Sequence, residues 1–398
     1  MGLTGWPFLW LTIAVAAGSL GCTVWLWPRL ARQRAAHIAS RLGLILLSQA
    51  LLIAASAVYA NDTFGFFGSW SVLLGTGPQQ RIATPSSVIA PAANATSLTV
   101  TGSSFGTMFR GGAVFPPDAS FRLAGVTPGR PELETRASTA GVVLRVTIHG
   151  EYTGIVGADD YVFLPPQYFQ PSYRWTRFPV ILTFTGYPND PLNLMRLLNL
   201  PAIAARLGAA GRIRPAIYVM VNPSVALPRD TECTNVPAGL QVATFFGTDV
   251  PLAVERTFAA RTSGSGWAAI GYSTGAYCAV KMAMLYPRQF TAAVSLSGYY
   301  VADMDRTTGD LYGGSLGYRH ENDLDWRLTH LPAPPVSVLV ASSASGEKSL
   351  PNTLGFLRLV KPPMRGYALI LPRGGHNYYT WRRELPQSLE WLSRRLAR

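Results

Sequence analysis

The sequence is short of charge and of cysteine. Only 14% of its 398 residues are charged and three are cysteine, while 48% are hydrophobic. So little charge excludes a disordered chain or a coiled coil, both of which are rich in charged residues. Three cysteines are too few for a disulfide-dense scaffold or a cysteine-rich zinc site. The chain also lacks a G-x-x-x-x-G-K-[ST] motif and any His/Cys/Asp cluster with metal-ligand spacing, so neither a cofactor nor a metal is expected.

Acidic residues are scarce, and the first 60 residues contain none. The chain carries a net charge of +13, yet its arginines are scattered and form no basic run interleaved with aromatic residues. Nucleic-acid binding usually needs a concentrated basic face, so no nucleic-acid partner is expected. Attraction to an anionic lipid surface is the more natural use of this charge.

Two long uncharged runs lie near the N-terminus, Phe8–Trp27 with 20 residues and Leu42–Ala60 with 19. A bilayer core about 30 Å thick needs roughly 20 apolar residues of helix. The alternative is a cleaved signal peptide followed by a buried helix, but a signal peptide carries its positive residues before the apolar run. Here the arginines follow the first run. The sequence therefore predicts a two-helix membrane anchor over residues 1–60.

The loop between the two runs predicts the orientation of the chain. It carries four arginines and no acid, so the positive-inside rule places it in the cytoplasm. Everything after Ala60 is then extracytoplasmic, where disulfides are permitted. Cys233 and Cys278 are expected to pair there, with two buried thiols as the alternative. Residues 61–138 are rich in Gly, Ser, Thr, Pro and Ala and are predicted to be an extracytoplasmic linker.

From about residue 139, apolar strands alternate with helical segments. Strands are expected within 143–149, 160–164, 178–184, 216–221, 267–270, 292–296, 336–341 and 367–371, and helices within 192–207, 250–260, 275–285 and 385–396. The first two strands form a hairpin, and the later alternation is typical of a mostly parallel sheet with helices on both faces. Residues 139–398 are therefore predicted to be an α/β catalytic domain, with its site at the carboxyl ends of the strands.

The most informative motif is Gly271-Tyr272-Ser273-Thr274-Gly275, which follows one predicted strand and opens a predicted helix. A G-x-S-x-G pattern alone is common by chance, but the strand–turn–helix context is typical of a nucleophile elbow. Small residues on both sides let the strand and the helix pass closely. The pattern predicts Ser273 as a nucleophile, with an ordinary glycine-rich turn as the alternative.

A serine nucleophile needs a base, and the chain has only five histidines. His376 is the one that directly follows the last predicted strand, and the order serine, acid, histidine is the order this motif requires. Glu347 is the only carboxylate in the loop after strand 336–341, so it is the expected acid. Asp303 and Asp305, which follow the preceding strand, are the alternatives.

Acyl transfer also needs backbone N–H groups that stabilise an oxyanion. One is expected from Thr274, the residue after the nucleophile. The other is expected from the loop after strand 178–184, which contains Gly186 and Tyr187. Gly186 permits the close approach of the backbone there, so Tyr187 is the expected second donor.

Four segments are informative when taken together, namely Phe178–Pro188, Gly271–Gly275, Ser295–Gly298 and Gly374–Trp381. Together they resemble the esterase D and antigen 85 (mycolyltransferase) branch of the α/β-hydrolases, and most closely its membrane-anchored actinobacterial esterases. The resemblance implies an α/β-hydrolase fold, acyl-ester chemistry, and a triad of Ser273, Glu347 and His376. Antigen 85 proteins have an Asp and an Arg for trehalose where this chain has Thr185 and Pro188. The resemblance therefore does not extend to trehalose mycolyl transfer.

Three classes of function follow from these patterns. The first is a membrane-anchored extracytoplasmic esterase that hydrolyses carboxylic esters, with a lipid-like acyl ester as a possible substrate class. The second is an acyltransferase that passes the acyl group to a sugar or lipid alcohol of the cell envelope. The third is a catalytically idle envelope protein on a hydrolase scaffold, against which the complete triad argues. The first two share an acyl-enzyme and differ in what reaches it.

Overall fold

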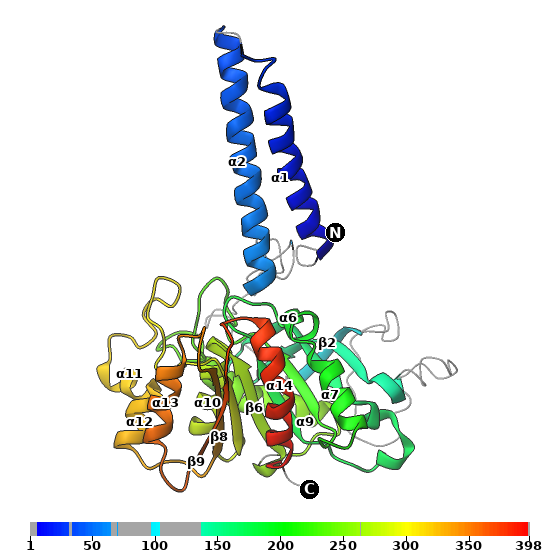
Figure 1. Ribbon diagram of the computed structural model, residues 1–398. Helices are drawn as coiled ribbons and strands as arrows, with labels where there is room; N and C mark the ends of the chain where they lie inside the picture. Colours follow the sequence, from blue (N-terminus) through cyan, green and yellow to red (C-terminus); the bar gives the residue numbers. More distant parts are fainter. Residues whose placement is uncertain are drawn as a thin grey trace, which may run out of the picture. The chain divides into compact units, whose positions relative to one another are not determined.

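The computed structural model describes residues 6–31, 34–64, 70, 97–103, 137–262 and 264–396 (Figure 1). These residues belong to two compact units, Met1–Gly77 and Pro78–Arg398. The first unit contains the two predicted apolar helices, and the second contains the sheet and every candidate site residue.

Two long helices make up the described part of the first unit, α1 (Trp6–Leu26) and α2 (Ala35–Phe64). Both are long and apolar enough to cross a membrane. The helices are joined by polar contacts, because the hydroxyl of Ser48 lies 2.9 Å from that of Ser19 and 3.0 Å from that of Thr23. Few of their apolar side chains are buried.

The second unit is built on a nine-stranded sheet with the strand order β1-β2-β3-β5-β4-β6-β7-β8-β9. The strands are β1 (Ser97–Ser103), β2 (Val142–His149), β3 (Val156–Leu164), β4 (Val180–Phe184), β5 (Ile217–Val221), β6 (Trp267–Tyr272), β7 (Ala292–Leu296), β8 (Ser337–Ser343) and β9 (Arg365–Leu371). The pairs β1–β2, β2–β3 and β3–β5 are antiparallel, and all later pairs are parallel. The predicted mostly parallel α/β sheet is confirmed.

Helices cover both faces of this sheet (Figure 1). The helices are α6 (Leu192–Arg196), α7 (Leu200–Ala209), α8 (Val242–Thr244), α9 (Val250–Thr257), α10 (Thr274–Leu285), α11 (Leu316–Asn322), α12 (Leu324–His330), α13 (Leu350–Leu359) and α14 (Tyr378–Ser393). Residues of α9, α10, α12 and α13 join one hydrophobic core, and residues of α7 and α14 join the other. Strand residues alternate between them, as Leu182 packs in the first core and Ile181 in the second.

Two differences from the sequence-based expectation concern the region before β5. The helix expected over 192–207 is two helices, because α6 ends at Arg196 and Asn199 takes a left-handed conformation with φ of +58° before Pro201. Asparagine tolerates this conformation, and proline fits only the first turn of the new helix. The predicted linker contains β1, which pairs with β2 at the edge of the sheet, so part of that segment belongs to the α/β unit. Most of the remaining linker lies outside the described residues.

Candidate active site

Ser273 lies in the turn between β6 and α10, at the carboxyl end of the parallel strands. Its φ is +56° and its ψ is −126°, a conformation that non-glycine residues rarely adopt. The turn is also tightly packed, because a Cβ atom at Gly271 or at Gly275 would lie 2.1 Å from a backbone oxygen. Only glycine fits at these two positions. The strained turn therefore presents the hydroxyl of Ser273 at the edge of the sheet, as the motif predicts.

His376 reaches Ser273 from the loop between β9 and α14. Its Nε2 lies 2.9 Å from Oγ of Ser273, so an unprotonated Nε2 can accept the hydroxyl proton. The edge of the imidazole meets Trp381, with ring centroids 5.1 Å apart and an interplanar angle of 86°. Nε1 of Trp381 is itself bonded to Oγ of Ser297 at 2.8 Å. The tryptophan thus packs against one side of the imidazole, while the side chain of His376 remains 48% exposed.

Glu347 lies on the other side of the imidazole, in the loop after β8. Its Oε1 is 3.8 Å from Nδ1 of His376, which is an ion-pair distance and too long for a hydrogen bond. Burial would raise the pKa of Glu347, but the nearby polar groups of His376, Ser297 and Ser349 outweigh it and hold the pKa below its usual value. The carboxyl group therefore stays ionised beside the histidine.

Sequence reasoning did not assign a role to the serines around Glu347. Ser342 lies 3.4 Å from Oε2 of Glu347 and bonds to Ser349 at 2.8 Å. Ser297 has a left-handed φ of +53° and directly follows β7. Ser297 belongs to the segment Ser295–Gly298 that carries the family resemblance, so the sequence did point to this residue. Its contact to Glu347 could not be predicted, because that contact depends on the packing of two separate loops.

The two alternative acids do not meet the histidine. Asp303 and Asp305 are exposed, and Oδ1 of Asp305 accepts bonds from its own turn, at Thr307 and Thr308. These bonds are the main reason why the pKa of Asp305 is lowered. Among the residues that the structure describes, no group of three His, Cys, Asp or Glu side chains could hold a metal ion.

The residues expected to supply the oxyanion donors lie on both sides of Ser273. Thr274 is the first residue of α10 and is only 5% exposed. On the other side, the backbone of the loop after β4 presses against Ser273, because a Cβ atom at Gly186 would lie 3.0 Å from Cβ of Ser273. Tyr187 follows in this loop. The backbone N–H groups of Thr274 and Tyr187 thus belong to the two segments that flank Ser273.

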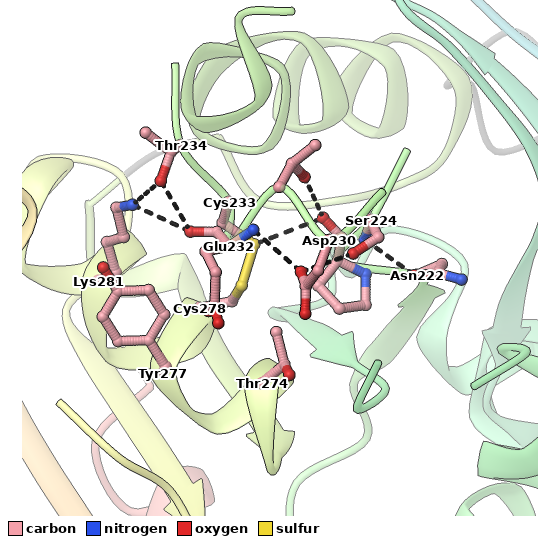
Figure 2. The surroundings of a disulfide bond; sticks show 12 residues. Asn222, Ser224, Asp230, Glu232, Cys233, Thr234, Thr274, Tyr277, Cys278 and Lys281 are labelled. Atoms are coloured by element: carbon pink, nitrogen blue, oxygen red, sulfur yellow. Dashed lines mark hydrogen bonds between the residues drawn. A yellow bond between two sulfur atoms is a disulfide. The ribbon is translucent and has the colours of Figure 1, made fainter. Parts of the chain in front are cut away.

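Cys233 and Cys278 form a disulfide, with Cα atoms 5.7 Å apart (Figure 2). Cys278 lies on α10, about one turn after Ser273, and Cys233 lies in the buried segment Asp230–Thr234. The bond therefore joins that segment to the helix that begins directly after Ser273. Cys22 of α1 is exposed and free.

Comparisons with known proteins agree with this architecture. The Esterase family model matches residues 160–327, a range that contains Ser273 but ends before Glu347 and His376. An uncharacterized protein of Corynebacterium glutamicum is 22% identical over 291 residues. That alignment covers 66% of this chain and 66% of the relative, so it spans slightly less than two thirds of the relative's length.

Several solved hydrolases have a similar fold. An S-formylglutathione hydrolase from Agrobacterium tumefaciens has a TM-score of 0.54 at 16% identity, covering 65% of this chain and 97% of that one. A ferulic acid esterase has a TM-score of 0.53 at 17% identity, with coverages of 64% and 98%. A fluorophosphonate-binding serine hydrolase of Staphylococcus aureus has a TM-score of 0.51 at 17% identity, with coverages of 64% and 98%. The second unit has the α/β-hydrolase fold.

Proposed function

We propose that this chain is a serine hydrolase of carboxylic esters. One observation carries the proposal: the strained Ser273 at the β6–α10 turn has its hydroxyl 2.9 Å from Nε2 of His376. A histidine at this distance can act as the base that a serine nucleophile needs. The match to the Esterase family model and the resemblance of the sequence motifs to the esterase D and antigen 85 branch support ester chemistry.

The proposed reaction proceeds through an acyl-enzyme. Oγ of Ser273 attacks the ester carbonyl carbon while Nε2 of His376 takes the hydroxyl proton, and Glu347 stabilises the imidazolium that results. The N–H groups of Thr274 and Tyr187 stabilise the negative oxygen of the tetrahedral intermediate. The intermediate collapses when the alcohol leaves with the proton from His376. Water then attacks the acyl-enzyme by the same steps and releases the acid.

We propose further that α1 and α2 anchor the enzyme in a membrane with residues 139–398 outside the cytoplasm. The arginines of the loop between the two helices and the lack of acidic residues there support a cytoplasmic loop. The disulfide between Cys233 and Cys278 supports an oxidising compartment for the catalytic domain. In that setting the substrate would be an ester at or near the outer surface of the membrane.

The test is hydrolysis of 4-nitrophenyl acetate by the detergent-solubilised full chain. We expect Ser273→Ala to abolish hydrolysis and labelling by an organophosphonate, because the attacking oxygen is lost. Ser345→Ala, a matched change at an exposed serine in the loop after β8, should retain both. Labelling that survives Ser273→Ala would contradict the proposal. Product analysis with an added alcohol distinguishes hydrolysis, which yields free acid, from acyl transfer, which yields a new ester.

A further inference from the structure

The buried segment Asp230–Thr234 lies along one face of α10, the helix that begins directly after the nucleophile. Thr274, Cys278 and Lys281 are four and three residues apart, so they share that face. Cys278 forms the disulfide to Cys233 in the middle of the segment (Figure 2). The other two residues make polar contacts to the same segment on either side of the disulfide.

Lys281 makes the contact farthest from the nucleophile. It is fully buried, and its Nζ donates to the backbone oxygen of Glu232 at 3.0 Å and to Oγ1 of Thr234 at 2.8 Å. Burial lowers the pKa of Lys281 to about 7, against the opposing charge of Glu232. A buried ammonium group is retained only where hydrogen bonds compensate its lost hydration. These bonds therefore fix the backbone of Glu232 to the helix.

The side chain of Glu232 reaches the other end of the same face. Its Oε1 accepts a hydrogen bond from the hydroxyl of Tyr299 at 2.7 Å, and that hydroxyl lies 3.1 Å from Oγ1 of Thr274. Glu232 is 1% exposed, and within the described part of the chain its Oε2 has no hydrogen-bond partner. Tyr299 is thus the side chain that connects this buried carboxyl group to the first residue of α10.

Two buried carboxyl groups lie close to the hydroxyl of Thr274. Burial raises the pKa of Glu232 well above its usual value, and the neighbouring Asp230 raises it further. Asp230 also has a raised pKa through burial, but it accepts bonds from the hydroxyl of Ser224 at 2.8 Å and from the backbone of Glu232 at 3.0 Å. The hydroxyl of Thr274 lies between Asp230 and Tyr299, and its oxygen is 3.1 Å from the hydroxyl oxygen of Tyr299. Its rotamer is therefore fixed from both sides.

The backbone of the segment is held in an unusual conformation. Glu232 and Cys233 both have a φ of +47°, although neither is glycine. Consecutive non-glycine residues with positive φ are costly and persist only where the surroundings fix them. Here the disulfide, the bonds from Lys281 and the bond from Tyr299 do so. Their combined effect is to aim the carboxyl group of Glu232 at the start of α10.

We propose that Glu232 is a positioning residue for the oxyanion hole, acting through the hydroxyl of Tyr299 to fix Thr274 and its backbone N–H. The inference rests on the proposed function, because it assigns a purpose to the N–H that would stabilise the oxyanion. An oxyanion donor is effective only when it is held in place before the reaction. A loosened donor weakens binding of the transition state and leaves the ester ground state almost unaffected.

The test compares four variants of the detergent-solubilised full chain on 4-nitrophenyl acetate. Tyr299→Phe and Glu232→Ala should each lower kcat by about tenfold with KM unchanged, less than the loss of a whole oxyanion donor. Combining them should cost no more than either alone, because both break one connection. Glu232→Gln should retain most of kcat, since its amide oxygen can still accept from Tyr299.

Tyr300→Phe is the matched control. Its hydroxyl is buried one residue further along and bonds to Ser295 at 3.3 Å, away from Thr274. It should lower Tm as much as Tyr299→Phe does and leave kcat unchanged. The inference is overturned if Tyr299→Phe keeps the wild-type kcat. It is also overturned if Tyr300→Phe lowers kcat as much as Tyr299→Phe does.

Labelling with an organophosphonate distinguishes a failure of this inference from a failure of the proposed function. A wild-type chain that neither hydrolyses the ester nor is labelled at Ser273 would overturn the proposed function and the inference together. If the wild-type chain hydrolyses the ester and is labelled at Ser273, and the Tyr299→Phe variant does so equally fast, only the inference is overturned. Slower labelling of Tyr299→Phe at unchanged affinity for the reagent is the expected result.

Discussion

Glu347 is the member of the proposed triad that stands farthest from its partner, since Oε1 lies 3.8 Å from Nδ1 of His376. Its charge should still matter, because an imidazolium forms beside it during the reaction. We expect Glu347→Gln to lower kcat on 4-nitrophenyl acetate by roughly 100-fold or more. The loss should be smaller than in Ser273→Ala, because the acid orients and stabilises but transfers no proton.

Asp305→Asn is the control for this change. Asp305 is exposed and bonded within its own turn, so its charge should contribute nothing to kcat. If Asp305→Asn lowered kcat and Glu347→Gln did not, the acid would have to be reassigned to the loop after β7. Steady-state kinetics of the two variants side by side decide between the two carboxylates.

Glu384 of α14 is another buried carboxyl group, and it lies close enough to Glu347 to feel its charge. Among the described residues, neither of its oxygens has a hydrogen-bond partner, and burial together with the charge of Glu347 raises its pKa to about 8. Between about pH 4.5 and 8, the unfolded chain has lost a proton that the folded chain keeps. The free energy of unfolding therefore falls as pH rises through this range, by at most about 5 kcal/mol.

We expect Glu384→Gln to remove this dependence, because the amide does not ionise. The difference in Tm between pH 5 and pH 8 should be smaller in the variant than in the wild type. Glu321→Gln, a change at an exposed carboxylate of α11, should follow the wild-type curve. A Glu384→Gln curve parallel to that of the wild type would show that this group does not titrate abnormally.

At the scale of single residues, the sequence predicted those candidate site residues whose positions follow from the ends of strands. Ser273, Glu347 and His376 each come shortly after a parallel strand, and such strand ends meet at one edge of a sheet. The supporting side chains could not be predicted in this way. Glu232 lies in an irregular segment far from any strand end, and its contact to Tyr299 depends on the left-handed backbone of that segment.

At the scale of elements, the disulfide joins α10 to a segment 45 residues earlier in the chain. A bond that closes a loop of this length restricts the unfolded chain, and its loss typically costs about 2–5 kcal/mol. We expect Cys233→Ser with Cys278→Ser to lower the free energy of unfolding by this amount in urea. Cys22→Ser, on α1, is the matched control and should leave the transition unchanged. An unchanged midpoint in the double variant would contradict the prediction.

The sequence predicted long, regular elements better than short or irregular ones. The helix expected over 275–285 is α10 almost to the residue, because a strand and a motif fix its start. The last helix begins at Tyr378, earlier than expected, because Asn377 caps it and Pro386 is accommodated inside it. β1 was not recognised, since only its backbone pairing with β2 distinguishes it from the surrounding Ser- and Thr-rich chain.

At the scale of the whole molecule, the distribution of charge bears on how the chain meets a membrane. The net charge of +13 says nothing about the fold of the sheet, but the position of the arginines bears on the membrane. Helices α1 and α2 are consistent with a membrane hairpin by length and composition. A hairpin places both of its ends on the same side. The side on which the loop lies therefore decides whether the proposed active site meets esters inside or outside the cell.

We expect the loop with Arg29 and Arg41 to be cytoplasmic and the α/β unit to be outside, because positive loops are retained on the cytoplasmic side. Trypsin added to intact spheroplasts should remove a C-terminal epitope tag together with the α/β unit, while the arginine loop stays uncut. Lysis should then expose the loop to cleavage, which serves as the control for protease activity. A protected α/β unit beside a loop that is cut in intact spheroplasts would reverse the orientation. The enzyme would then act on esters in the reducing cytoplasm, where a disulfide such as that of Cys233 and Cys278 rarely persists.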